Sequence, residues 1–156
     1  MEKFSKPSIT AKRGFRLAKT IFLKDGYKET YRTLPGSGKF DSFKTHPFAD
    51  RSKVSSASGA YGIIAATWKT NLPFLALSTT EDQFSPNVQD RIAVVLMEQN
   101  HNALALVRQG KIEEAARSLA TVRYIQWPSL PGGDQSNGYT VTQMMDAYNT
   151  FLKKVG

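Results

Sequence analysis

The sequence predicts an α+β fold that is mainly helical, with one small β-hairpin in the first third of the chain. Amphipathic helical patterns recur along the chain, one glycine- and aromatic-rich segment interrupts them, and no repeat or linker divides the 156 residues. The length suits one domain, and a composition of 40% hydrophobic and 22% charged residues is typical of a folded chain. We therefore expect a single domain over residues 1–156.

The first half of the chain combines an amphipathic helix with a turn-rich segment. Residues 8–24 carry a loose apolar stripe with lysines between, and Gly26 supplies a helix end. Glycine, proline, threonine and aromatic residues predominate next, which favours short strands around a turn at 34–40. The predicted elements are a helix over 8–24, an otherwise irregular segment over 27–48 with strands at 31–34 and 39–43, a loop over 52–59, and a buried helix over 61–70.

The second half contains clearer helix signals. Ser85 followed by Pro86 is an N-cap with a first-turn proline, and Thr140 with Gln143 forms a capping box. Two prolines and two glycines within residues 127–133 exclude a helix there. The predicted elements are a helix from 86, helices over 102–109 and about 112–119, a turn over 127–133, and a last helix after 140.

The positive charge of the chain is concentrated in its first third. Residues 1–53 carry 13 Lys and Arg against five Asp and Glu, a net charge of +8, whereas residues 54–156 are neutral overall. This asymmetry predicts an anionic partner, either nucleic acid, a membrane surface or an acidic wall polymer, with a merely solubilising surface as the alternative. The aromatic residues among these cations fit a half-buried hairpin better than a nucleic-acid surface, so nucleic acid is the less favoured partner.

Chemistry that depends on cysteine is excluded, and a metal site is disfavoured. The chain has no cysteine, so it forms no disulfide and no thiolate metal site. Its two histidines, His46 and His101, leave little scope for a metal, and His46 before a proline favours a hydrogen-bonded turn. We expect no cofactor, no metal and a monomer.

No segment of the sequence has the length and hydropathy of a membrane span. The longest apolar runs, 92–97 and 103–107, are far short of the roughly 20 residues required. The first residues lack the apolar core of a secretory signal. We therefore expect synthesis in the cytoplasm without a signal peptide, so any action outside the cell requires another route.

Four short motifs follow one another along almost the whole chain. They are GSGKFDSFKTHP at 36–47, SASGAYGIIAATW at 56–68, FSPNVQDR at 84–91 and WPSLPGG at 127–133. In this order they resemble the lambda-type endolysin family, phage lysozymes that act as lytic transglycosylases on peptidoglycan. The resemblance extends over about residues 13–152.

The resemblance implies a lysozyme-like fold with a saccharide cleft between two lobes. The front helix and β-hairpin lobe would span about 8–50 and the helical lobe about 60–155. It also implies that one carboxylic acid cleaves the MurNAc–GlcNAc bond, whereas ordinary glycosidases need two. That acid protonates the glycosidic oxygen while the sugar's own 6-hydroxyl closes onto the anomeric carbon, which gives a 1,6-anhydromuramic end.

The catalytic acid is the point at which this chain departs from the family. The family's Glu-Gly-Thr motif aligns with Asp25, Gly26 and Tyr27, so a shorter carboxylate stands in place of the glutamate. A displacement of about 1 Å at a reacting centre costs on the order of 100-fold in rate. Glu29 is the alternative acid, and the two candidates stay open at the level of sequence.

The glycan contacts are altered as well. Gly62 stands where the family has a cleft-lining glutamine, and the resemblance suggests Tyr61 and Tyr31 as substrate-binding residues. Gln135 or Tyr139 could replace the missing amide. Retained scaffold motifs with an altered site fit two hypotheses: a divergent lytic transglycosylase, or a degenerate relative that binds wall glycan or a protein partner without cleavage. Either would reach the wall by holin-type release or by delivery in a particle.

Overall fold

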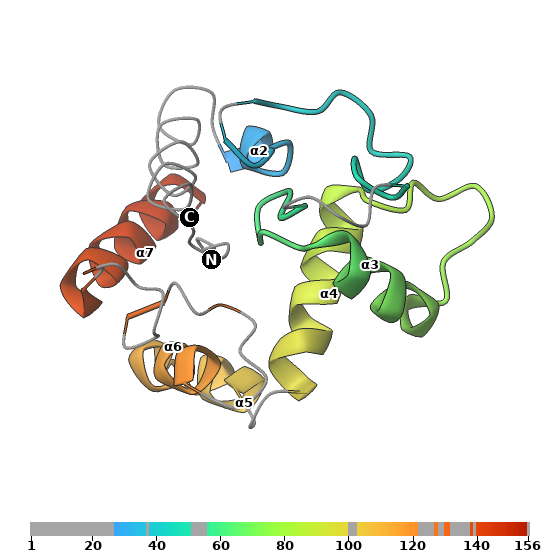
Figure 1. Cartoon of the computed structure of the whole chain (residues 1–156). Coiled ribbons are helices and arrows are strands. Elements are labelled where there is room, and N and C mark those ends of the chain that lie inside the picture. The colour runs from blue at the N-terminus through green and yellow to red at the C-terminus, as the bar shows by residue number, and fades with distance from the viewer. Residues whose placement is uncertain are drawn as a thin grey trace.

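The computed structural model describes residues 27–36, 38–50, 56–99, 103–121, 127, 130–131, 138 and 140–155. This part is mainly helical (Figure 1). Its elements are α2 (Tyr27–Thr30), α3 (Ala65–Asn71), the 3₁₀ helix η1 (Leu72–Leu75), α4 (Pro86–Gln99), α5 (Ala103–Arg108), α6 (Ile112–Thr121) and α7 (Val141–Val155). The helix predicted over 8–24 lies outside the described residues.

The predicted β-hairpin is wrong for the part of the chain described. A single antiparallel bridge joins Thr33 to Lys39, and the backbone bonds from Leu34 N to Gly38 O (3.0 Å) and from Phe40 N to Arg32 O (2.9 Å) complete the turn. Helix α2 ends at Thr30, so the residues expected to begin the first strand, 31 and 32, form the turn that follows this helix. This one-turn helix was not predicted by the sequence pattern, which indicated only an irregular segment there.

The buried helix expected over 61–70 begins later, at Ala65. A tight turn precedes it, closed by paired backbone bonds between Ser58 and Ile63 (3.1 and 2.9 Å). Gly59 and Gly62 adopt φ of +76° and +56° in this turn, a conformation that glycine tolerates best. The turn therefore delays the helix by four residues and places Tyr61 at the tip of a loop.

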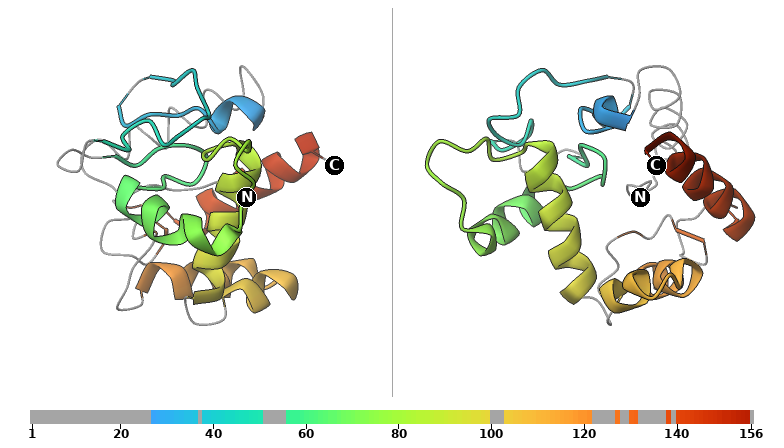
Figure 2. Two further views of the ribbon diagram at one scale, coloured as in Figure 1. Left: turned by 90° about the vertical axis from the view of Figure 1, so that its right-hand side faces the viewer. Right: turned by 180° about the vertical axis from the view of Figure 1, so that it is seen from behind.

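Helix α4 forms the centre of the described core. Its predicted start is confirmed: Pro86 is the first helical residue, and the Val88 amide donates to Ser85 Oγ (3.2 Å). Helix α3 packs beside α4, and α5 contacts both α4 and α6 (Figures 1 and 2). The core contains side chains from these helices, from α7 and from the residue pair before α4, and it includes Trp68, Phe84, Val88, Ile92, Leu96, Ala103, Leu119 and Met144.

The corner around His46 is tied by hydrogen bonds, as the sequence predicts. His46 is 1% exposed; its Nε2 lies 2.7 Å from the Ile63 carbonyl oxygen, and its Nδ1 accepts from the Phe48 amide (3.1 Å). Nδ1 is therefore unprotonated and Nε2 carries the proton. The ring also packs 4.6 Å from Phe84 and 5.7 Å from Trp68, measured between centroids. This corner joins the 38–50 segment to the helical core.

The predicted helices of the second half are confirmed with small shifts in their ends. Helix α5 spans Ala103–Arg108 and α6 spans Ile112–Thr121. The capping box before α7 is present, because the Thr140 amide donates to Gln143 Oε1 (2.9 Å) and the Gln143 amide to Thr140 Oγ1 (3.2 Å). No described helix is long and apolar enough to cross a membrane.

Candidate functional site

Two tyrosines from separate segments meet at one carboxylate of α4. The Tyr31 hydroxyl donates to Asp90 Oδ1 (2.8 Å), and the Tyr61 hydroxyl donates to the same oxygen. The two rings lie edge to face with centroids 6.2 Å apart, a favourable arrangement for aromatic pairs. These three residues, Tyr31, Tyr61 and Asp90, are called the tyrosine–aspartate cluster below.

Gln89, the neighbour of Asp90, fixes the backbone of the same two segments. Its Nε2 donates to the carbonyl oxygens of Tyr31 (3.1 Å) and Phe84 (2.9 Å), while its Oε1 accepts from the Ala60 amide (3.0 Å). The side chain is fully buried. A Cβ at Gly59 would lie 2.7 Å from Gln89 Cδ, so only glycine leaves room for this amide. Hydrogen bonds from Gln89 therefore hold the backbone at Tyr31 and the 59–62 turn against α4.

Tyr61 is held from a third direction. The Trp127 indole N–H donates to the Tyr61 carbonyl oxygen (2.9 Å), and both side chains are buried, at 4% and 8% exposed. Tyr31 is only partly buried. Within the cluster, Tyr31 is thus the tyrosine whose ring is more accessible to a ligand, and Tyr61 lies beneath the surface as its support.

Glu29 lies on α2, two residues before Tyr31. Its Oε1 is 3.8 Å from Arg32 Nε and its Oε2 is 3.6 Å from Lys39 Nζ. Arg32 is itself fixed, because its guanidinium stacks 4.1 Å from the Phe43 ring centroid and donates to the Phe40 carbonyl oxygen. The Glu29 carboxylate is therefore held beside two cationic side chains.

Comparison with known proteins assigns the chain to a family. A family model described as Endolysin matches residues 18–156, most of the sequence. The chain is a member of the endolysin family. These are peptidoglycan-degrading, lysozyme-like enzymes, and the predicted resemblance to the lambda type is confirmed.

A solved structure supports the lysozyme-like fold of this endolysin. It is bacteriophage lambda lysozyme complexed with a chitohexasaccharide, with a TM-score of 0.59 and 24% identity. The match covers 90% of this chain and 89% of the other. No curated protein matches the chain. The β-hairpin expected in the front lobe is replaced, in the described part, by the bridge between Thr33 and Lys39.

The described part of the endolysin includes some of the predicted site residues and not others. Tyr31 and Tyr61 are brought together, and Glu29 lies on the same segment as Tyr31. Gly62 lies in the turn directly after Tyr61, where its φ of +56° suits glycine. Three predicted residues lie outside the described residues: Asp25, Gln135 and Tyr139.

Asp90, Gln89 and Trp127 are site-building residues that sequence reasoning did not assign. In the sequence, the Gln-Asp pair stands out only as part of a helix-start motif, and Trp127 as part of a turn whose indole favours packing over stacking on a sugar. The position of Gln89 and Asp90 could have indicated these roles. Consecutive residues one turn into a helix point in different directions, so one side chain can enter the core while the other reaches a site.

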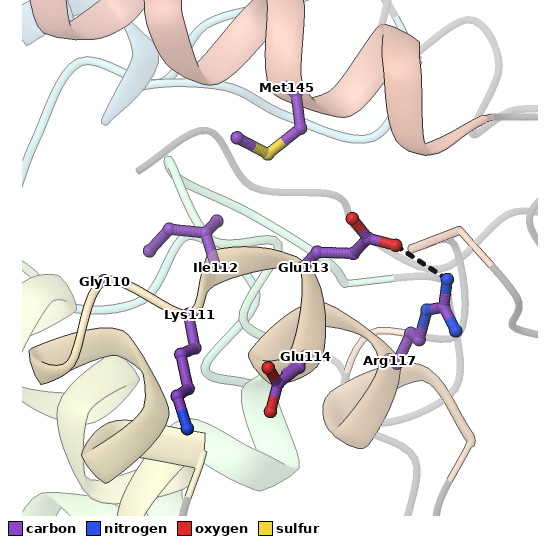
Figure 3. A pocket seen from close by; sticks show the side chains of 7 residues that line it. All are labelled: Gly110, Lys111, Ile112, Glu113, Glu114, Arg117 and Met145. Atoms are coloured by element: carbon purple, nitrogen blue, oxygen red, sulfur yellow. Dashed lines mark hydrogen bonds and ion pairs between the residues drawn. The ribbon is translucent and has the colours of Figure 1, made fainter.

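A separate cavity of about 440 Å³ opens between α6 and α7 of the endolysin. Its lining includes Lys111, Glu113 and Arg117, with Met145 on the opposite side (Figure 3). Glu113 pairs with Arg117 at 2.6 Å. None of the predicted site residues lines this cavity. Among the described residues, no group of three or more His, Cys, Asp or Glu side chains could hold a metal ion.

Proposed function

We propose that this endolysin is a lytic transglycosylase that cleaves MurNAc–GlcNAc bonds of peptidoglycan beside the tyrosine–aspartate cluster. The observation that supports the proposal is the convergence of Tyr31, Tyr61 and the Glu29-bearing helix α2 at the start of α4. Aromatic rings with polar tips suit sugars, which combine apolar C–H faces with hydroxyl groups. The chitohexasaccharide bound to lambda lysozyme is consistent with a glycan ligand.

The proposed reaction needs one carboxylic acid. Its proton passes to the glycosidic oxygen as the bond from that oxygen to the anomeric carbon breaks. The 6-hydroxyl oxygen of the same sugar forms a new bond to the anomeric carbon, and its proton returns to the carboxylate. Atoms and charge balance without water, so the product is a 1,6-anhydro sugar.

We assign the acid to Asp25 in preference to Glu29. Glu29 is engaged by Arg32 and Lys39, contacts that turn its carboxylate toward these two side chains. Asp25 occupies the position that aligns with the family's glutamate. Tyr31 is proposed as the main described glycan contact, with Tyr61 as its support. The further proposed substrate-binding residues are Gly62, Gln135 and Tyr139.

A second candidate function is glycan binding without cleavage. The ion pairs of Glu29 favour it, because they engage one of the two candidate carboxyl groups in contacts with Arg32 and Lys39. In both cases we propose one lysozyme-like domain that acts as a monomer. It would reach the cell wall after holin-type release or delivery in a particle, and the basic first third would contact anionic envelope polymers.

Digestion of purified sacculi distinguishes the two functions. Mass spectrometry should detect anhydromuropeptides after incubation with the wild type, and Asp25→Asn should abolish them. Glu29→Gln should retain most of the activity, because the proposal gives Glu29 no part in the proton transfer. No anhydromuropeptide from the wild type at high protein concentration would contradict catalysis. Loss of activity in Glu29→Gln alone would transfer the acid role to Glu29.

A further inference from the structure

Asp90 and Gln89 are neighbours on α4 that bind the same two segments in different ways. Gln89 bonds the backbone of Tyr31 and Ala60, whereas Asp90 accepts the hydroxyl protons of Tyr31 and Tyr61. We infer that Asp90 is a positioning residue of the glycan site, which acts by fixing the Tyr31 hydroxyl as a hydrogen-bond acceptor. The inference rests on the proposed function and adds to it a preference for donor groups of the glycan.

The preference follows from the number of protons and lone pairs on a tyrosine hydroxyl. A tyrosine hydroxyl has one proton and two lone pairs, so a hydroxyl that donates to a carboxylate can only accept from any further group. Donation to an anion also polarises the phenol oxygen and strengthens it as an acceptor. A sugar hydroxyl or an acetamido N–H can therefore bond Tyr31, whereas an acetamido carbonyl oxygen cannot.

The anchoring of the two segments does not by itself require a carboxylate. Gln89 already joins both segments to α4 through two hydrogen bonds, to Tyr31 and Ala60, and its fully buried side chain makes a third to Phe84 just before the helix. A partly buried negative charge is costly unless strong hydrogen bonds compensate it, and a neutral side chain would fill the same place without that cost. What the carboxylate adds is the direction of two hydroxyl protons, which matters for a ligand at Tyr31.

A double-mutant cycle on glycan affinity tests the inference. Calorimetry would measure the affinity of chitohexasaccharide for the wild type, Asp90→Asn, Tyr31→Phe and the double variant, with thermal unfolding as a check on folding. Asp90→Asn keeps the shape, but an amide presents either an acceptor oxygen or a donor nitrogen where the carboxylate only accepts, so the side chain no longer dictates that Tyr31 donates. We expect it to weaken binding about tenfold, the loss of roughly one hydrogen bond, and to have almost no further effect in the Tyr31→Phe background. The matched control is Glu98→Gln on the exposed side of α4, which should bind normally.

Each outcome decides a different statement. An equal loss from Asp90→Asn in both backgrounds overturns action through Tyr31, because a merely structural role would be additive. Normal binding by Asp90→Asn overturns the inference while glycan binding stands. If Asp90→Asn does not fold, unchanged affinity of Tyr31→Phe overturns it. Absence of chitohexasaccharide binding and of sacculus digestion by the wild type overturns the proposed function, and the inference with it.

Discussion

At the scale of single residues, His46 shows how one side chain makes the fold sensitive to acid. Its ring is buried against Phe84 and Trp68, and burial lowers its pKa below the ordinary 6.5. The hydrogen bond to the Ile63 carbonyl oxygen opposes this shift but is the smaller effect. Protonation would also require Nδ1 to give up the hydrogen bond from the Phe48 amide. The neutral form is thus the one compatible with the native packing.

The free energy of unfolding should therefore fall as the pH decreases below about 6.5. In that range the unfolded chain takes up a proton at His46 and the folded chain does not. The stability contributed by neutral His46 is complete above the unfolded pKa of 6.5, and it is lost progressively as the pH falls from there through the folded pKa. The slope cannot exceed about 1.4 kcal/mol per pH unit for this one group. Urea unfolding across this range would measure it.

The two histidines provide the control for this measurement. His101→Gln should retain the wild-type pH dependence, whereas His46→Gln should be less stable at neutral pH and lose that part of the dependence. Equal pH dependence in the wild type and His46→Gln would show that other groups cause it. The acid sensitivity would then have to be assigned to the carboxylates.

At the scale of elements, the 59–62 turn is specified by one close approach. Gly59 has φ of +76°, and its Cα faces the Gln89 side chain so closely that a Cβ would lie 2.7 Å from Gln89 Cδ. The Gln89 side chain cannot move away from such a Cβ without breaking its hydrogen bonds to Tyr31, Ala60 and Phe84. This turn delays α3 and places Tyr61 in the tyrosine–aspartate cluster.

Replacement of Gly59 by alanine should be markedly more damaging than the same change at Gly110. Both glycines have φ of +76°, but a Cβ at Gly110 meets no heavy atom within 4 Å. Gly110→Ala should cost about 1 kcal/mol of unfolding free energy from backbone strain alone. Gly59→Ala should cost about 2 kcal/mol more, because it also forces the Gln89 side chain to shift. Similar losses in urea unfolding would contradict the packing argument.

Sequence patterns predicted the elements whose signals are local. The starts of α4 and α7 depend on Ser85–Pro86 and on Thr140 with Gln143, which act within a few residues of the helix end. The hairpin prediction failed because a turn-rich aromatic segment satisfies both a hairpin and a single bridge. The choice between a hairpin and a single bridge depends on α2 and on the hydrogen bond from Gln89 to Tyr31. Gln89 is 58 residues from Tyr31 in the sequence.

The same distinction applies to the candidate site. Tyr61 could be proposed from the motif at 56–68 in which it lies, and Tyr31 from the aromatic, turn-rich segment that precedes the first motif. Asp90 could not, because its role exists only where two loops converge on one turn of α4. The ion pairs of Glu29 with Arg32 and Lys39 likewise could not be proposed from the sequence, because Lys39 reaches Glu29 only when the turn folds back.

At the scale of the whole molecule, the uneven charge is expected to govern attachment to the wall. The first 53 residues hold the net charge of +8, and the described cations Lys28 and Lys44 of this segment are exposed. Attraction of a cationic segment to an anionic polymer weakens with salt because both charges are screened. Attachment to sacculi should therefore weaken steadily as the ionic strength rises.

Charge reversal at an exposed lysine should weaken this attachment more when the lysine lies in the basic first third than when it lies in the rest of the chain. Lys44→Glu lowers the charge of the basic segment by two and should reduce retention on sacculi that carry anionic polymers, most strongly at low salt. Lys111→Glu makes the same change in the neutral remainder of the chain and should have a smaller effect. Co-sedimentation at several salt concentrations would measure both, with duplex DNA as a parallel ligand. Equal effects of the two substitutions would indicate a non-specific response to net charge, and tighter retention on DNA than on sacculi would favour nucleic acid as the partner of the basic segment.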